Sequence, residues 1–244
     1  DYFRDLGNHY CKFSPLINLT YLNSYKIFAS TKESKKIIPS IYHKKTEVLL
    51  AVATDDFKIK KKKFPKKKFR ICFAGRLLSW KGLHIILEAY ELITKKCKNT
   101  SLTIIGDGII KDLLKKKAKL LNIDNSITWA GQVKQEKVLQ YFNNNDLIML
   151  PSLRDSGGFV ILEAIKSGSI VAVCNLGGPG AIIDNTCGIS IDVKNKNQTQ
   201  VARDMSKSVI KLINNKKKYN NMKKKSLEKI KKLTWKNKIK KIYY

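Results

Sequence analysis

Apolar and amphipathic segments alternate from Phe69 onward, and this alternation constrains the fold more than any other feature of the chain. The short apolar runs, which predict strands, are residues 69–75, 102–106, 127–131, 146–150 and 170–174. The segments with apolar residues at helical spacing are residues 81–96, 110–121, 136–143 and those that follow Ser156. Strands that alternate with helices predict an α/β fold with a doubly wound parallel sheet. Ligands of such sheets bind in the loops at the carboxyl ends of the strands.

Residues 151–180 place two carboxylates around one predicted helix. This helix is expected to open at residues 156–158 and to be buried, because it is apolar on nearly every side. Glu163 in its middle would then need a partner, since an unpaired carboxylate is costly in an apolar interior. Asp155 comes just before the helix, whose first backbone N–H groups are free to bind an anion. Together these features suggest a ligand that carries both phosphates and hydroxyls.

Two cations and several glycines follow other predicted strands. Arg76 and Lys81 come after the first strand, where together they could neutralise a diphosphate; two ordinary surface cations are the alternative. Gly106 and Gly108 form a tight turn after the second strand, but this turn lacks the full dinucleotide fingerprint. Residues 177–180, Gly-Gly-Pro-Gly, are predicted to form a glycine-rich loop; an ordinary turn is the alternative. Each motif is weak alone, so their order along the chain carries the argument.

In this order the motifs resemble those of the family-four retaining glycosyltransferases, which have a two-domain fold of the GT-B type. The matching residues are Gly75-Arg76-Leu77 with Lys81-Gly82, Gly106-Asp107-Gly108, Gly131, Pro151-Ser152, Asp155 and Glu163 with seven residues between them, and Gly177-Gly178. The match covers residues 69–192. The resemblance implies a Rossmann-like C-terminal domain that binds a sugar donor and follows a remnant of the N-terminal domain. It also implies hexosyl transfer from a nucleotide sugar with retention at the anomeric carbon, without cofactor or metal ion.

The resemblance further implies roles for individual residues. Arg76, Lys81 and Asp155 would be catalytic, with the two cations holding the donor diphosphate and Asp155 positioning the sugar. Glu163 would bind the ribose hydroxyls; the structural alternative makes it a core residue bonded to a backbone N–H or a lysine. The other donor-binding residues implied are the base-binding loop Gly131, Gln132 and Val133, together with Gly75, Gly106, Gly108, Ser156, Gly157, Gly158, Phe159, Val160, Gly177 and Gly178.

Two departures from the family pattern affect the identity of the transferred sugar more than the class of reaction. Asp155 stands where the broad family has Glu, and the loop at residues 177–180 lacks an acidic residue that is often found there. The sequence identifies neither the base nor the sugar of the donor. For the acceptor, a glycan or a lipid-linked molecule is expected, as in polysaccharide or glycolipid synthesis.

Four segments are expected along the chain. Residues 1–57 would be the end of the acceptor domain, 58–68 a charged linker, 69–228 the donor-binding domain and 229–244 a C-terminal crossover helix. The first segment offers short helices at 16–25 and after Thr31, and short strands at 26–30 and 47–52. That is too little to bury a core of its own, so we expect the isolated chain to be incomplete for catalysis. In the last segment one helix face is predicted to carry Trp235, Ile239, Ile242 and Tyr243.

The net charge of +30 comes from 49 basic residues, of which only five are Arg. Proteins that read nucleic acid depend on Arg, so we expect no nucleic-acid partner. Solvated lysine faces are the plain interpretation, and a basic surface facing an anionic membrane is the alternative. The five cysteines show no metal spacing and indicate a reducing compartment, and no apolar run is long enough to span a membrane. We therefore expect a cytoplasmic protein, with peripheral attachment to the inner membrane face as a variant.

Two other classes of function stay open. A sugar-nucleotide epimerase or a phosphorylase on the same fold would share the diphosphate site, but its full-length form would not hydrolyse the donor. A non-catalytic basic module for RNA or an anionic membrane would bind in a salt-dependent way that free nucleotide sugars do not affect.

Overall fold

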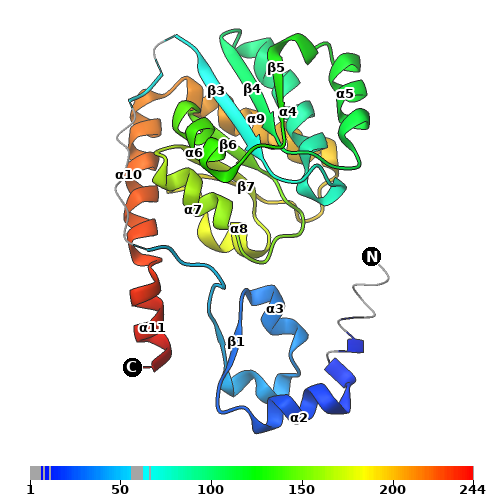
Figure 1. The fold of residues 1–244 in the computed structure, drawn as a ribbon, viewed down its shortest axis with the longest axis vertical. Helices are drawn as coiled ribbons and strands as arrows, with labels where there is room; N and C mark the ends of the chain where they lie inside the picture. Colours follow the sequence, from blue (N-terminus) through cyan, green and yellow to red (C-terminus); the bar gives the residue numbers. More distant parts are fainter. Residues whose placement is uncertain (1–6, 8, 11, 56–62, 66, 244) are drawn as a thin grey trace. The chain divides into compact units, whose positions relative to one another are not determined.

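The computed structural model describes residues 7, 9–10, 12–55, 63–65 and 67–243. The chain divides into two compact units: the first unit, Asp1–Ala51, and the second unit, Val52–Tyr244 (Figure 1). The predicted linker at residues 58–68 falls largely on positions 58–62 and 66, which lie outside the described residues.

The first unit contains two short parallel strands and their helices. Its elements are α2 (Pro15–Asn23), β1 (Ile27–Ala29), α3 (Lys32–Ile37), the 3-10 helix η1 (Ser40–Lys45) and β2 (Thr46–Val48). The predicted cap of α3 is present, because the Thr31 side chain accepts a hydrogen bond from the Ser34 N–H at 3.1 Å. β2 ends at Val48, earlier than predicted, because β1 offers only three residues for pairing.

The core of the first unit is small. Ala29, Ile38 and Tyr42 are buried, and Tyr21 and Ile27 pack against them. None of the residues of α2 is buried. This is a smaller apolar interior than an independent domain needs.

The second unit is built on a six-stranded sheet in which every neighbouring pair of strands is parallel. Its strands are β3 (Phe69–Ala74), β4 (Thr100–Ile105), β5 (Ile127–Gly131), β6 (Leu147–Leu150), β7 (Ile170–Cys174) and β8 (Ile189–Ile191). Their order across the sheet is β5-β4-β3-β6-β7-β8. The central strands β6 and β7 are buried along their whole length, as a parallel sheet covered on both faces requires. The predicted parallel sheet is confirmed.

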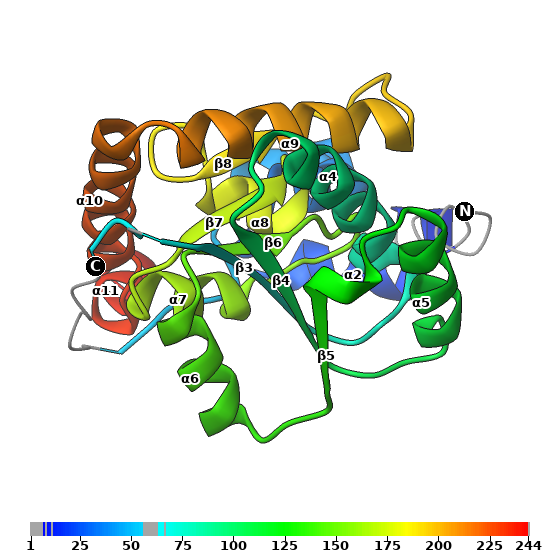
Figure 2. The same cartoon turned by 90° about the horizontal axis from the view of Figure 1, so that it is seen from above.

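Helices cover both faces of this sheet (Figure 2). On one face lie α4 (Leu83–Lys96), α5 (Lys111–Leu120) and α9 (Gln198–Ile213), and on the other α6 (Gln135–Asn144) and α7 (Phe159–Lys166). The remaining helical elements are the 3-10 helices η2 (Ser79–Lys81) and η3 (Asp124–Ser126), α8 (Gly177–Ile182), α10 (Lys216–Lys232) and α11 (Trp235–Tyr243). No helix in the part of the chain that the structure describes is both long and apolar enough to cross a lipid bilayer.

The helix predicted at residues 81–96 begins later than expected. Lys81 ends η2, and Gly82 then adopts φ +75° before α4 starts at Leu83. A Cβ at Gly82 would lie 2.2 Å from the carbonyl oxygen of Pro151, so this close approach requires glycine. The turn separates Lys81 from the rigid helix and leaves its side chain on the loop side.

The prediction of a glycine-rich loop at residues 177–180 is wrong, because these residues form the first turn of α8. Pro179 fits this position, since the N–H that proline lacks has no helical partner in a first turn. The N–H of Gly180 donates to the carbonyl oxygen of Leu176 at 3.0 Å, which closes the turn.

The expectation that α7 is buried on all sides is also wrong. Ile161, Leu162, Ala164 and Ile165 are buried, but Phe159 is 56% exposed. Glu163 is only partly buried. The reason is that α7 packs against β7, α6 and α10 with one face only. Glu163 therefore does not face the desolvation of a core residue.

Two terminal helices complete the second unit. α10 packs against both α7 and α9, and α11 follows it after Thr234. Backbone hydrogen bonds tie this junction to Thr54: its N–H donates to the Leu233 carbonyl oxygen at 2.9 Å, and its own carbonyl oxygen accepts from the Trp235 N–H at 3.1 Å. The start of α11 therefore has a fixed place in the second unit.

Candidate functional site

A pocket of about 160 Å³ lies at the carboxyl ends of β3 and β6. These two strands are neighbours at the point where the strand order reverses, since β4 and β5 lie beyond β3 while β7 and β8 lie beyond β6. Doubly wound sheets bind ligands beyond the carboxyl ends of the strands, at the point where the strand order reverses. The residues that line the pocket are Phe73, Ala74, Gly75, Arg76, Lys81, Leu150, Ser152, Asp155, Gly158, Val160, Ile161 and Pro179.

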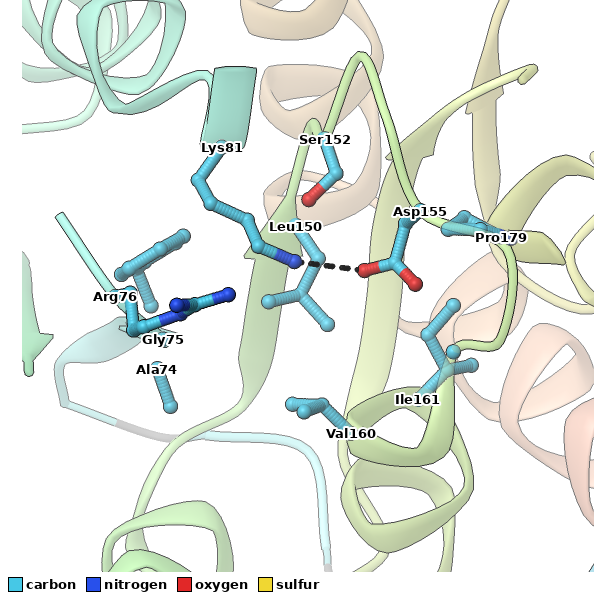
Figure 3. Close-up of a pocket in the computed structure, with 12 residues that line it drawn as sticks. Ala74, Gly75, Arg76, Lys81, Leu150, Ser152, Asp155, Val160, Ile161 and Pro179 are labelled. Atoms are coloured by element: carbon cyan, nitrogen blue, oxygen red, sulfur yellow. Dashed lines mark hydrogen bonds and ion pairs between the residues drawn. The ribbon is translucent and has the colours of Figure 1, made fainter. Parts of the chain in front are cut away.

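The pocket carries more positive than negative charge. Lys81 reaches between Arg76 and Asp155 (Figure 3), and its Nζ lies 2.9 Å from Asp155 Oδ2. Among the residues that the structure describes, no carboxylate forms an ion pair with Arg76. One cation is therefore paired with a carboxylate, and the other is available to an anion.

Asp155 is held in place from two sides. Its Oδ1 accepts a hydrogen bond from the Gly157 N–H at 3.2 Å, and its carbonyl oxygen accepts from the Gly178 N–H at 2.9 Å. The first bond occupies one of the N–H groups that the sequence offered to an anion. Within the described structure, the N–H groups of Gly158 and Phe159 have no hydrogen-bond acceptor and remain available.

Glycines allow the start of α8 to pack directly on the loop before α7. A Cβ at Gly178 would lie 2.4 Å from the Gly157 carbonyl oxygen and 2.7 Å from that of Ser156. Gly177 has φ +53°, and a Cβ there would lie 2.4 Å from the Asp155 carbonyl oxygen. Neither of these two glycines lines the pocket. These glycines hold the loop that carries Asp155 in place, because the two backbones approach too closely to leave room for a side chain.

The turn after β4 supports Arg76 in the same way. Gly106 has φ +125°, and a Cβ there would lie 2.0 Å from the Gly75 carbonyl oxygen. A Cβ at Gly108 would lie 2.4 Å from the Leu77 carbonyl oxygen. Between them, the Asp107 carboxylate accepts hydrogen bonds from Lys111 and the Gly108 N–H, which together hold the pKa of Asp107 below its usual value. This turn thus positions the Arg76 segment and lies outside the pocket.

The structure divides the predicted site residues into two groups. Those that line the pocket are Gly75, Arg76, Lys81, Asp155, Gly158 and Val160. Those that lie outside its lining are Gly106, Gly108, Gly131, Gln132, Val133, Ser156, Gly157, Phe159, Glu163, Gly177 and Gly178. Gly131 contacts the turn after β4 that positions Arg76, since its carbonyl oxygen accepts a hydrogen bond from the Gly106 N–H at 2.8 Å.

The protein-family model "Glycosyl transferases group 1" matches residues 54–229, which is most of the chain. The chain belongs to the group 1 glycosyltransferases. An uncharacterised glycosyltransferase of Methanocaldococcus jannaschii is 32% identical to it over 183 residues, which is 74% of this chain and 44% of that relative. The chain thus spans less than half the length of this curated relative. Neither a sugar-nucleotide epimerase, a phosphorylase nor a non-catalytic module gains support from these comparisons.

Solved structures share the fold of this group 1 glycosyltransferase. TarM from S. aureus superposes with a TM-score of 0.75 at 18% identity, over 93% of this chain and 45% of TarM. The C-terminal domain of LpcC, a group 1 glycosyltransferase from Francisella tularensis, gives a TM-score of 0.58 at 20% identity, over 67% of this chain and 84% of that domain. The expected α/β fold of the GT-B type, with its Rossmann-like sheet, is confirmed.

Two side-chain placements were not anticipated from the sequence. Ser152 lines the pocket, although the sequence singled it out only as part of a Pro-Ser motif. Gln135, at the start of α6, donates a hydrogen bond from Nε2 to Glu163 Oε1 at 2.8 Å. No sequence signal identifies this contact, because an exposed Gln in the first turn of a helix is ordinary. It gives Glu163 a side-chain partner instead of the backbone N–H or lysine that the structural alternative supposed.

Proposed function

We propose that the pocket binds the diphosphate of a nucleotide sugar and that the chain is the donor-binding part of a retaining glycosyltransferase. The observation that carries this proposal is the placement of Arg76 and Lys81 against a single carboxylate, Asp155, at the reversal of the strand order. The pocket volume of about 160 Å³ is smaller than the roughly 300–1,000 Å³ of a complete ligand site. It therefore suits one charged part of a larger ligand.

The comparisons support a nucleotide as that ligand. TarM, which shares the fold, was solved in complex with UDP and α-GlcNAc-glycerol, and HepE from Anabaena was solved in complex with UDP. We take UDP as the probe for this chain, without assigning the base or the sugar of its own donor.

The proposed reaction breaks the bond between the anomeric carbon and the diphosphate. The oxygen of an acceptor hydroxyl takes its place on the same face of the sugar, and the hydroxyl proton passes to the departing diphosphate. Arg76, Lys81 and the N–H groups of Gly158 and Phe159 would stabilise the charge that develops on the leaving diphosphate. Asp155 would hold Lys81 in the empty enzyme and position the sugar in the complex. Family-four membership, retention and the absence of a metal requirement are parts of this proposal.

The remaining parts of the reaction require more than this chain. Since it spans less than half the length of the curated relatives it matches, we propose that an acceptor domain, to which residues 1–57 belong, binds a glycan or lipid-linked acceptor. The donor-binding domain is proposed at residues 69–228 and the crossover helix at 229–244. We also propose a cytoplasmic location, with peripheral association to the anionic inner face of the membrane, because the chain carries a net charge of +30.

The test of the proposed function is calorimetric titration of the purified chain with UDP and, separately, with uridine. We expect UDP to bind and uridine to bind at least tenfold more weakly, because the diphosphate makes the charged contacts. The same titration with magnesium chelated should give the same UDP affinity. Equal binding of UDP and uridine would rule out a diphosphate site in this pocket, and so would a failure of UDP, GDP and ADP alike to bind.

Glu163→Gln tests the proposed ribose contact. A carboxylate can accept from two ribose hydroxyls, whereas the amide that replaces it offers only one oxygen. We expect the affinity for UDP to fall by about 1–3 kcal/mol while that for 2′-deoxy-UDP changes little. Because Glu163 is only partly buried, the melting temperature of the empty protein should stay nearly level.

The matched control is Glu136→Gln, an equal change at an exposed residue in the first turn of α6. If Gln135 orients the Glu163 carboxylate through its 2.8 Å hydrogen bond, Gln135→Ala should also lower the ratio of UDP affinity to 2′-deoxy-UDP affinity. The decrease should be smaller than that for Glu163→Gln. If Glu163→Gln keeps the parent ratio of UDP to 2′-deoxy-UDP affinity, Glu163 does not bind the ribose.

A further inference from the structure

The hydroxyl of Ser152 is buried in the wall of the pocket, and it has no hydrogen-bond partner among the residues that the structure describes. The residue is only 4% exposed, and its oxygen points toward the side of the pocket where Lys81 meets Asp155 (Figure 3). A buried hydroxyl that makes no hydrogen bond is costly, so we expect it to find a partner when the pocket is occupied.

Other buried serines show how this cost is normally avoided. The Ser169 hydroxyl lies 2.8 Å from each of two backbone carbonyl oxygens, and the Ser206 hydroxyl donates to another carbonyl oxygen at 2.8 Å. Ser14 and Ser167 are buried without a side-chain partner in the described part of the chain, but neither lines the pocket. Ser152 therefore combines an unpaired buried hydroxyl with a place in the pocket wall.

The backbone at Ser152 is fixed against the segment that carries Lys81. The carbonyl oxygen that precedes Ser152 would lie 2.2 Å from a Cβ at Gly82. The N–H of the residue that follows Ser152 donates to the Trp80 carbonyl oxygen at 2.8 Å. Both chain neighbours of Ser152 thus meet both chain neighbours of Lys81, and this arrangement holds the hydroxyl close to the segment of the pocket lysine.

The other polar side chains of the pocket offer Ser152 no unused acceptor atom. The polar side chains in the pocket lining are those of Arg76, Lys81, Ser152 and Asp155. The two cations can only donate hydrogen bonds. Each carboxylate oxygen of Asp155 already accepts one, Oδ2 from Lys81 at 2.9 Å and Oδ1 from the Gly157 N–H at 3.2 Å. A ligand that accepts from two cations and a hydroxyl fits this set, and a phosphate group with its several oxygens can do so.

We propose that the Ser152 hydroxyl donates a hydrogen bond to the terminal phosphate of the nucleoside diphosphate. This inference rests on the proposed function and adds a contact that distinguishes a diphosphate from a monophosphate. Asp155, toward which the hydroxyl points, is proposed to position the sugar. The phosphate nearest to Ser152 is then the one that carries the sugar in the donor, and this phosphate is the terminal one in UDP.

The experiment is calorimetric titration of the whole chain and of its Ser152→Ala variant with UDP and with UMP. We expect the variant to bind UDP about tenfold more weakly, because one hydrogen bond to a charged group is lost, and to bind UMP as the parent does. The melting temperature without ligand should stay level or rise, since the variant no longer buries an unpaired hydroxyl. Ser152→Cys, which keeps a side chain of similar shape but is a weak donor, should lose UDP affinity in the same way.

The matched control is Ser169→Ala, which removes a buried hydroxyl that is already hydrogen-bonded within the protein. It should lower the melting temperature and leave the UDP affinity unchanged. If Ser152→Ala gives this same pair of results, its hydroxyl supports the fold and the proposal is overturned. Full UDP affinity in Ser152→Cys would assign the effect to the volume of the side chain, and equal losses for UDP and UMP would place the contact elsewhere on the ligand; either result overturns the proposal.

Inorganic pyrophosphate separates this inference from the proposed function. If the parent chain binds pyrophosphate about tenfold more tightly than Ser152→Ala does, but binds no nucleoside diphosphate, the Ser152 contact stands and the nucleotide donor fails. If the parent and Ser152→Ala bind UDP equally well, the nucleotide donor stands and the Ser152 contact fails. If the parent binds none of UDP, GDP, ADP and pyrophosphate, both are overturned.

Discussion

Gly106→Ala is expected to lower the free energy of unfolding by about 2–5 kcal/mol and to abolish UDP binding. The added Cβ would stand 2.0 Å from the Gly75 carbonyl oxygen, at a backbone φ of +125° that side chains rarely adopt. Relief of this overlap must move either the turn after β4 or the segment that begins at Gly75. The second movement displaces Arg76, so stability and binding should fall together.

Gly131→Ala is the control for the stability change alone, since Gly131 belongs to the proposed base-binding loop. Gly131 also has a positive φ, +67°, but a Cβ there would meet no atom within 4 Å. The backbone conformation alone should cost about 1–2 kcal/mol. Chemical denaturation and UDP titration of both variants provide the measurement. If the two variants lose the same stability and both keep UDP binding, the approach of Gly106 to Gly75 does not support the pocket.

Arg76→Ala and Lys81→Ala are each expected to weaken UDP binding by about 1.5–3 kcal/mol, the range for hydrogen bonds to charged groups. Lys81→Ala should cost more, because it also leaves Asp155 without its cation, beside the incoming diphosphate. Adding Asp155→Asn to Lys81→Ala removes this repulsion and should restore part of the affinity. Isothermal titration of the single and double variants measures the coupling.

The control for these variants is Lys111→Ala. Lys111 also pairs with an aspartate, Asp107, at the carboxyl edge of the sheet, but it does not line the pocket. Its removal should change UDP affinity by less than the removal of either pocket cation. A comparable loss would mean that UDP responds to the charge of the whole edge, and the assignment of the diphosphate to Arg76 and Lys81 would fail.

The sheet could be predicted from the sequence because its strands are nearly continuous apolar runs. Residues 146–150 and 170–174 predicted β6 and β7 to within one residue, since strands buried on both faces have no polar side. Most of the glycine motifs could be predicted as well, because a position where two backbone segments lie in close contact leaves no room for a side chain. The pocket cations and Asp155 followed from their place after such strands.

What the sequence could not predict depends on packing between distant elements. α7 was expected to be buried on all sides from its composition, but only one of its faces has neighbours, so Phe159 is exposed and Glu163 partly so. The contact between Gln135 and Glu163 joins α6 to α7, and neither residue has a local signal for it. Residues 177–180 were predicted as a loop because of their glycines, yet α8 uses those glycines to approach the Asp155 loop.

The ion pair between Lys81 and Asp155 sets a threshold on what can enter the empty pocket. An anion that binds both cations must draw Lys81 away from Asp155, and only a ligand with several charged oxygens can engage Arg76 at the same time. Under the proposed function, free inorganic phosphate should compete poorly with Asp155 for the lysine, because it has fewer points of attachment. The pair would therefore favour longer phosphate chains over small anions at this pocket.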